Sequence, residues 1–252
     1  MPMRDLYLEG QGAGGQALWR AFLLPWLLLT GSWGVLGVAF LTGHNSWLDH
    51  DYLIRGNHWP WPLAGLVFLA SWQVMLLAMM LPGLFNSLLL LPHHLARYWP
   101  EQVLFIVGYA GSWSLFACAA FVGDTLLHGL VGRWRWLYLH PQWIAALLFA
   151  LAGLVQWSPL KWHCLRHTRL HQQETRGSPW RQGYRYGLWC VGCNWALMLL
   201  MVGVGMRNLL ALASLTLLMW LERTWSRGKV LGLCAGAGCL LYALVIVMPP
   251  IF

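Results

Sequence analysis

The chain has 252 residues, of which 59% are hydrophobic and only 10% are charged, and its mean hydropathy is +0.55. Soluble domains carry about one-quarter charged residues, so this composition excludes a water-soluble globular protein and any large soluble domain. Because no soluble basic domain could present the net charge of +8 to a duplex, we attribute that charge to topology and contact with anionic lipid, and we expect no nucleic-acid partner.

Apolar runs recur along the whole chain. A hydrocarbon core about 30 Å thick needs roughly 20 apolar residues per helix, and the fourth and sixth runs fall short of that length. The run after Arg20 lacks the short core and small-residue exit of a cleavable signal peptide, so we interpret it as a retained first helix. The runs predict an all-α polytopic transmembrane helix bundle of about seven spans, forming a single domain over 1–252. The predicted spans are 21–41, 62–91, 103–122, 143–157, 186–204, 209–221 and 230–247.

The distribution of Lys and Arg predicts the orientation of the spans. Twelve of the 16 basic residues fall in segments that lie inside when the N-terminus is cytoplasmic, and the other four fall outside. Cytoplasmic segments are enriched in Lys and Arg, so we expect an N-in, C-out protein of the cell inner (cytoplasmic) membrane. The most basic segment, 161–185, is then cytoplasmic.

Small residues at helical spacing predict where helix backbones approach one another closely. Gly31, Gly34 and Gly37 lie in the first span, and Gly232 and Gly236 lie in the last. These glycines indicate packing rather than chemistry.

Methionines gather in the second span. At 100° per residue, Trp72, Met75 and Met79 lie close to one stripe, whereas Met80 points away from Met75. At most two thioethers therefore share a face. Methionine commonly fills gaps in apolar cores, so the pattern favours packing over ligation of a soft metal.

Histidines follow the fourth span. If the helix continues beyond the membrane, His163, His167 and His171 form a stripe, and Cys164 lies three residues before His167. Imidazole and thiolate at this spacing can bind Zn or Cu. A solvated basic segment with interfacial histidines is the other interpretation.

Two thiols lie one helical turn apart in the fifth span. Cys190 and Cys193 could chelate one ion or form a redox pair. Covalent haem is not expected, because Asn194 stands where an attachment site needs His. The cytoplasm keeps thiols reduced, so a metal or reversible redox chemistry is favoured over a structural disulfide. Three isolated cysteines are interpreted as small buried hydrophobes: Cys118, Cys234 and Cys239.

The polar segment between the first two spans holds further nitrogen and oxygen ligands. It could bind a metal or could simply be a hydrated loop, and we favour the hydrated loop. The residues are His44, Asp49, His50, Asp51 and His58.

Together the motifs of residues 65–225 resemble the DUF2182 family of predicted metal-binding integral membrane proteins. The resemblance rests on Trp72, Met75, Ala78, Met79, Met80 and Pro82, on Gly108, Tyr109 and Trp113, on Gln156, Pro159, Leu160, Lys161, Cys164 and Leu165, on Gly187, Cys190, Gly192, Cys193, Trp195, Leu197 and Met198, and on Glu222. It implies a membrane protein that binds a metal.

The chain departs from that family pattern at two positions. His167 replaces a second cysteine, and Asn194 replaces the second thiol of a Cys-Cys pair. Histidine can substitute for cysteine as a ligand, whereas Asn is a poor ligand for a soft metal. An altered or diminished site is therefore one implication.

These observations predict a membrane protein that binds or handles a soft metal ion, with copper favoured over zinc because thioethers accompany the thiols. The first alternative is a non-catalytic accessory subunit of a larger membrane complex, and the second, less favoured, is a membrane thiol oxidoreductase. An enzyme is not favoured. The expected partners are the lipid bilayer and other membrane proteins. The predicted ligands are Cys164, His167, Cys190 and Cys193, with Met75, Met79, Met198 and His163 as further candidates.

Overall fold

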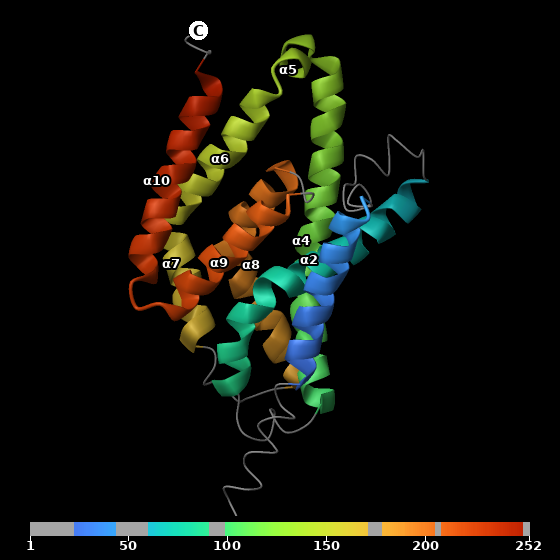
Figure 1. Ribbon diagram of the computed structural model, residues 1–252, viewed down its shortest axis with the longest axis vertical. Helices are drawn as coiled ribbons and strands as arrows, with labels where there is room; N and C mark the ends of the chain where they lie inside the picture. Colours follow the sequence, from blue (N-terminus) through green and yellow to red (C-terminus); the bar gives the residue numbers. More distant parts are fainter. Residues whose placement is uncertain (1–22, 44–59, 91–98, 171–177, 205–207, 249–252) are drawn as a thin grey trace, which may run out of the picture.

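The computed structural model describes residues 23–43, 60–90, 99–170, 178–204 and 208–248, and these form helices with no strand among them (Figure 1). The all-helical prediction is therefore confirmed. The polar segment with the predicted nitrogen and oxygen ligands, 44–59, and His171 lie outside the described residues. The helices are the first helix Leu23–Leu41, α2 Trp61–Leu90, α4 Trp99–Arg133, α5 Arg135–Leu139, α6 Gln142–Trp157, α7 Pro159–Leu170, α8 Pro179–Val204, α9 Leu209–Thr224 and α10 Gly228–Val247.

Five of the described helices are long and apolar enough to cross a membrane: the first helix, α2, α4, α8 and α10. A sixth span is present if α6 and α7, which meet at a bend of 64°, count as one. This supports a multi-pass membrane protein. α9 has only 16 residues, and the count of seven spans stays a prediction.

The bend between α6 and α7 is encoded in the sequence Ser158-Pro159. A proline disfavours helical geometry in the residue before it, and Ser158 is extended, with φ −63° and ψ 134°. The Ser158 Oγ then accepts the Leu160 amide at 3.2 Å, which caps the first turn of α7. α7 therefore leaves the axis of α6 and carries Lys161 and Cys164 toward α8.

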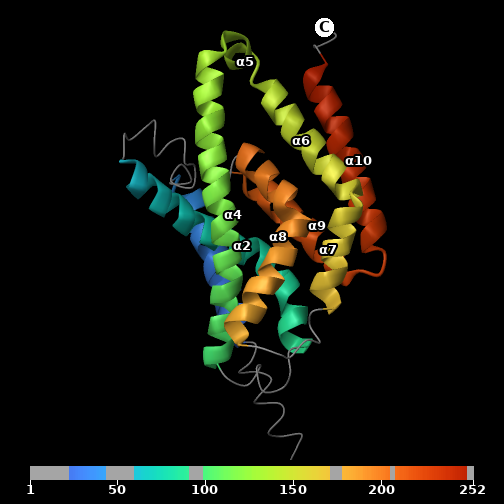
Figure 2. The ribbon, with the colours of Figure 1, turned by 180° about the vertical axis from the view of Figure 1, so that it is seen from behind.

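α4 and α8 run parallel and pack closely because glycines face the partner helix. A Cβ at Gly183 would collide with the backbone carbonyl of Phe105, and one at Gly187 would collide with Ser112 Oγ. Seen from behind, the two helices lie side by side (Figure 2). This contact brings Tyr109 of α4 against the thiol-bearing part of α8.

The predicted close approach at the last helix is confirmed, and the one at the first helix is wrong within the described part of the chain. A Cβ on Gly236 would lie 2.9 Å from Gln156 Cβ of α6. Side chains added at Gly31, Gly34 or Gly37 would meet nothing within 4 Å. A glycine pattern indicates only that two helix backbones can approach closely at that place. Other residues determine against which helix the first helix packs.

The first helix docks through Trp33 instead. Pro82 has no N–H, so α2 loses the hydrogen bond that residue 82 would donate to the Ala78 carbonyl. Trp33 Nε1 donates to that carbonyl at 3.1 Å. A buried carbonyl without a donor is costly in lipid, so this bond ties the first helix to α2.

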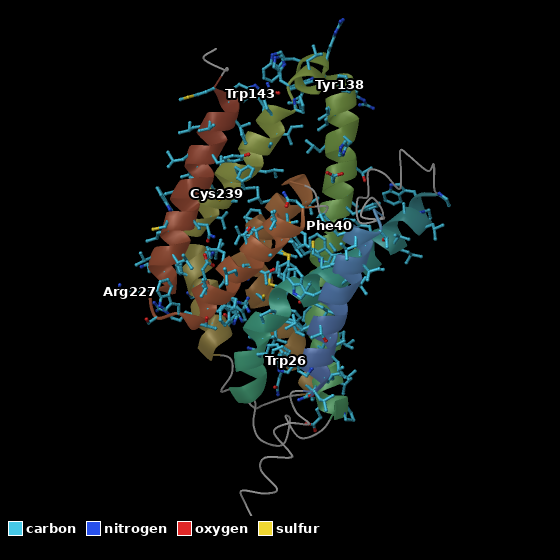
Figure 3. All side chains as sticks on the ribbon, viewed as in Figure 1. Trp26, Phe40, Tyr138, Trp143, Arg227 and Cys239 are labelled. Atoms are coloured by element: carbon cyan, nitrogen blue, oxygen red, sulfur yellow. The ribbon has the colours of Figure 1, made fainter. Side chains whose placement is uncertain are left out.

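The ends of the bundle carry residues typical of an interface. Tyr138 and Trp143 lie at the α5 end, and Arg227 lies at the turn between α9 and α10 (Figure 3). Amphipathic rings favour the headgroup region.

Cys118 and Cys234 are exposed on the protein surface and Cys239 is only partly buried, so the prediction that they are buried is wrong. Apolar helices in a membrane direct such side chains to lipid as readily as to the core.

Candidate metal site

Cys190 and Cys193 lie one turn apart on α8, and both thiols are fully buried. Cys193 Sγ donates to the Cys190 carbonyl at 3.2 Å. The two sulfurs therefore face the interior of the bundle, as their spacing predicts, and neither is in a disulfide.

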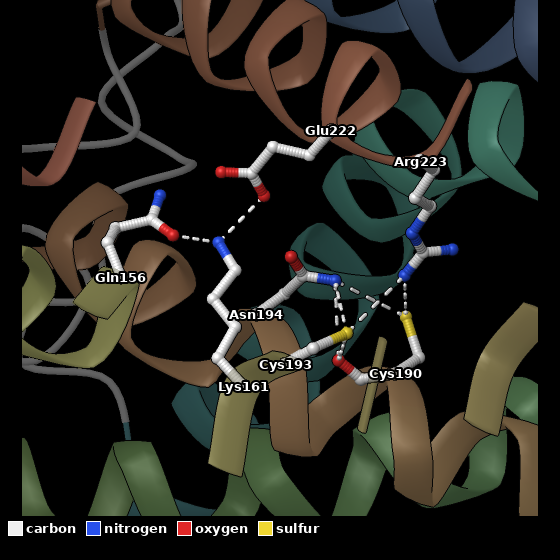
Figure 4. A network of polar contacts seen from close by, with 7 residues as sticks. All are labelled: Gln156, Lys161, Cys190, Cys193, Asn194, Glu222 and Arg223. Atoms are coloured by element: carbon white, nitrogen blue, oxygen red, sulfur yellow. Dashed lines mark hydrogen bonds and ion pairs between the residues drawn. The ribbon is translucent and has the colours of Figure 1, made fainter. Parts of the chain in front are cut away.

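Polar groups from three helices surround the two sulfurs, and Figure 4 shows those of α8 and α9. Asn194 Nδ2 of α8 lies 3.7 Å from Cys190 Sγ and 3.3 Å from Cys193 Sγ. Tyr109 Oη of α4 lies 3.2 Å from Cys190 Sγ. Arg223 Nη2 of α9 lies 2.7 Å from Cys190 Sγ and 3.9 Å from Cys193 Sγ. N–H groups and a guanidinium so close to sulfur stabilise negative charge on it in a surrounding of low dielectric constant.

Arg223 reaches the thiols across α2. A Cβ at Gly83 would lie 3.0 Å from Arg223 Cδ, so the absence of a side chain at Gly83 makes room for the arginine stem. Tyr186 Oη accepts from Arg223 Nη1 at 3.2 Å. The guanidinium is thus held between α2 and α8 with one face on the thiol pair.

Cys164 of α7 lies on the Cys193 side of α8. It forms one buried cluster with Leu165 and Cys193, against which Trp162 and Trp189 pack. A Cβ at Gly192 would lie 2.8 Å from Cys164 Sγ, so that glycine admits the third thiol. Cys164 of α7 and Cys193 of α8 are therefore neighbours. A shared ion between Cys164 and Cys193 stays a prediction.

The histidines lie at the edge of this cluster rather than among the sulfurs. His163 is exposed, and His167 stacks on Trp189 with ring centroids 4.4 Å apart and an interplanar angle of 14°. The two imidazole rings lie 4.5 Å apart. Over the described ranges, no three His, Cys, Asp or Glu side chains are grouped so that they could hold a metal ion. The four-ligand set of Cys164, His167, Cys190 and Cys193 is therefore not assembled as a unit.

The candidate thioethers lie in the same core as Cys190. Met75 and Met79 of α2 and Met198 of α8 are almost completely buried, and Met80 joins them. Met80 is expected to lie off the stripe of Met75 and Met79. It is nevertheless buried in the same core, because other helices cover both of these faces of α2. The core around Cys190 is thus rich in soft sulfur.

A second buried polar centre lies beside the thiols. Lys161 Nζ of α7 donates to Glu222 Oε2 of α9 at 2.7 Å and also to Gln156 Oε1 (Figure 4). Both ion-pair partners are 1% exposed. Glu222 and Arg223 are neighbours in sequence, yet one binds α7 and the other reaches α8. The end of α9 therefore connects α7, which carries Cys164, with α8, which carries Cys190 and Cys193.

Sequence reasoning missed the part played by three residues. In the sequence Tyr109 is one residue of the family motif, Arg223 is one of 16 basic residues, and Asn194 stands only for a lost thiol. The position of Arg223, close to the end of a predicted span, could have indicated a functional role. A charge at membrane depth is energetically costly and needs a partner. Nothing in the pattern indicates that Asn194 donates to sulfur.

The donor chemistry of the site suits a soft metal ion. Thiols, and the thioethers of the methionines in the same core, are ligands that soft ions such as Cu(I) prefer. The carboxylate nearest to the thiols along α9, Glu222, is bound to Lys161.

A family model described as "PpoB2: Copper chaperone" matches residues 69–246. The matched region extends from α2 into α10 and contains the thiols, Tyr109, Asn194, Arg223 and the Lys161–Glu222 pair. No curated protein and no solved structure matches the chain.

Proposed function

Because the chain belongs to the PpoB2 family, whose model is described as a copper chaperone, we propose that it holds Cu(I) within the membrane and passes it to a partner protein. The observation that carries this proposal is the buried pair of Cys190 and Cys193, with hydrogen-bond donors directed at both sulfurs. The resemblance of the motifs to the DUF2182 family is consistent with this role.

Cu(I) is the cargo, and the thiols of α8 bind it. Each ion displaces the two thiol protons to water and is held by two thiolates, because a soft ion prefers sulfur. Met75, Met79 and Met198 supply thioethers that can share the ion. Asn194 and Tyr109 orient the sulfurs and stabilise their charge.

Release follows the path from the buried thiols toward α7. Cys164 packs beside Cys193, and His167 and His163 lie progressively closer to the surface. Exchange of the ion from one ligand to the next along this path lets a partner take copper from exposed imidazole without free Cu(I) entering water. The receiving partner is a second protein that presents soft ligands at this end of the bundle.

Metal content of the purified protein tests the proposal. Protein loaded with Cu(I) under reducing, oxygen-free conditions is expected to retain a stoichiometric amount of copper after desalting against a Cu(I) chelator. Protein loaded with Zn(II) in the same way is expected to retain little. If neither preparation retains metal, the role of a non-catalytic accessory subunit takes the place of the chaperone.

The same proposal assigns the segment 161–185 to the cytoplasm, where thiols stay reduced. This segment holds six Lys and Arg residues, and the starts of α4 and α8 and the end of α7 lie toward one end of the bundle (Figure 1). In the variant Ser178→Cys, with Cys118 and Cys234 replaced by Ser, a membrane-impermeant thiol reagent added to intact cells is expected to leave residue 178 unlabelled. Efficient labelling that requires no permeabilisation would reverse the orientation.

A further inference from the structure

Arg223 places a positive charge beside the thiol pair, and within the described part of the chain no carboxylate pairs with it. The hydrogen-bond partners of Arg223 among the described residues are the two sulfurs and the Tyr186 phenol. The other cation nearby, Lys161 of α7, is paired with Glu222 of α9 at 2.7 Å. From α4 and α8 the groups that face the sulfurs are Tyr109 and Asn194, which are uncharged. The surroundings of the pair therefore carry one net positive charge.

We propose that Arg223 makes the site selective for monovalent over divalent soft cations; this inference rests on the proposed binding of metal by Cys190 and Cys193. Two thiolates, one guanidinium and a monovalent ion sum to zero charge. With a divalent ion the same groups carry one uncompensated positive charge. A buried charge without a partner is strongly disfavoured, so Cu(I) or Ag(I) leaves a neutral site and Zn(II) or Cd(II) does not.

The geometry places the guanidinium where its charge acts on the ion. Nη2 lies 2.7 Å from Cys190 Sγ, and the same nitrogen lies 3.9 Å from Cys193 Sγ. An ion held by both sulfurs is therefore a near neighbour of the guanidinium. The space beside Gly83 and the hydrogen bond to Tyr186 fix the position of Arg223 next to the sulfurs. A solvated lysine side chain would have no such fixed position.

The experiment compares the affinity of the purified full-length chain for Ag(I) and for Cd(II), followed by the ultraviolet absorption of the thiolate complexes. Arg223→Met removes the charge and retains a long apolar stem. It is expected to lower the ratio of Ag(I) to Cd(II) affinity about tenfold or more, since a unit charge near a metal retains a large interaction even at an effective dielectric constant of about 20. Arg227→Met, the matched control, makes the same substitution at an exposed arginine in the turn between α9 and α10 and is expected to leave the ratio unchanged.

A second variant leaves Arg223 in place. Asn194→Asp adds one negative charge beside the same sulfurs and is expected to shift the preference toward Cd(II). This variant tests the effect of charge on the metal preference if Arg223→Met does not fold. An unchanged ratio in the folded variants would overturn the inference and leave Arg223 as a brace between α9 and α8. Loss of Ag(I) binding by the wild type would instead refute the proposed function itself.

Discussion

Replacing Cys190 by Ser is expected to abolish stoichiometric retention of Cu(I). Its sulfur is the one that Tyr109, Asn194 and Arg223 all contact, and a serine hydroxyl is a poor ligand for a soft ion. Loss of groups that merely support a metal ligand costs about 10–100-fold in affinity, so loss of the ligand itself is expected to cost more. Copper per chain after desalting against a Cu(I) chelator is the measurement.

Cys118→Ser is the matched control for this prediction. Cys118 is a free thiol on α4 that faces away from the bundle, so its removal is expected to leave copper content unchanged. Full copper retention by Cys190→Ser, together with loss in Cys164→Ser, would contradict the assignment and move the site to the α7 side of α8.

Breaking the buried ion pair is expected to be the most destabilising single change in the bundle. Lys161→Met removes the ammonium group that pairs with Glu222, which is 1% exposed. Removing one partner of a buried pair costs about 3–5 kcal/mol, because an uncompensated charge remains. The midpoint of thermal unfolding in detergent is expected to fall sharply in Lys161→Met and in Glu222→Leu.

The double variant Lys161→Met with Glu222→Leu separates charge from packing. Replacing both partners by apolar side chains is often neutral or stabilising, so the double variant is expected to unfold closer to the wild type than either single one. Lys229→Met changes an exposed lysine on α10 and is expected to change the midpoint little. Additive losses in the double variant would mean that shape, rather than charge, makes the pair important.

Hydropathy predicted the helices well because lipid requires long apolar runs. α2 begins at Trp61, one residue before the predicted span. The ends are less predictable, since a helix does not have to stop where the membrane does. α4 continues to Arg133, past the predicted end at 122, because its polar residues after the apolar run still satisfy helical geometry. Apolarity also leaves open whether the 16 residues of α9 cross the bilayer.

The site was predictable only in its thiols. Spacing along α8 predicts that Cys190 and Cys193 share a face, because that relation is local. The positions of Cys164 and Arg223 depend instead on two glycines, Gly192 and Gly83, whose missing side chains admit a sulfur and an arginine from other helices. A single sequence does not reveal which helix will fill such a space.

The hydrogen bond between Trp33 and the Ala78 carbonyl joins an earlier-synthesised helix to a later one. Translation runs from the N-terminus at about 5–20 residues per second, so the indole donor is synthesised before the carbonyl that Pro82 leaves without its helical donor. The two residues are 45 positions apart in the chain. The family match begins at residue 69, so the first helix lies outside the matched region and still supplies the donor for a carbonyl inside it.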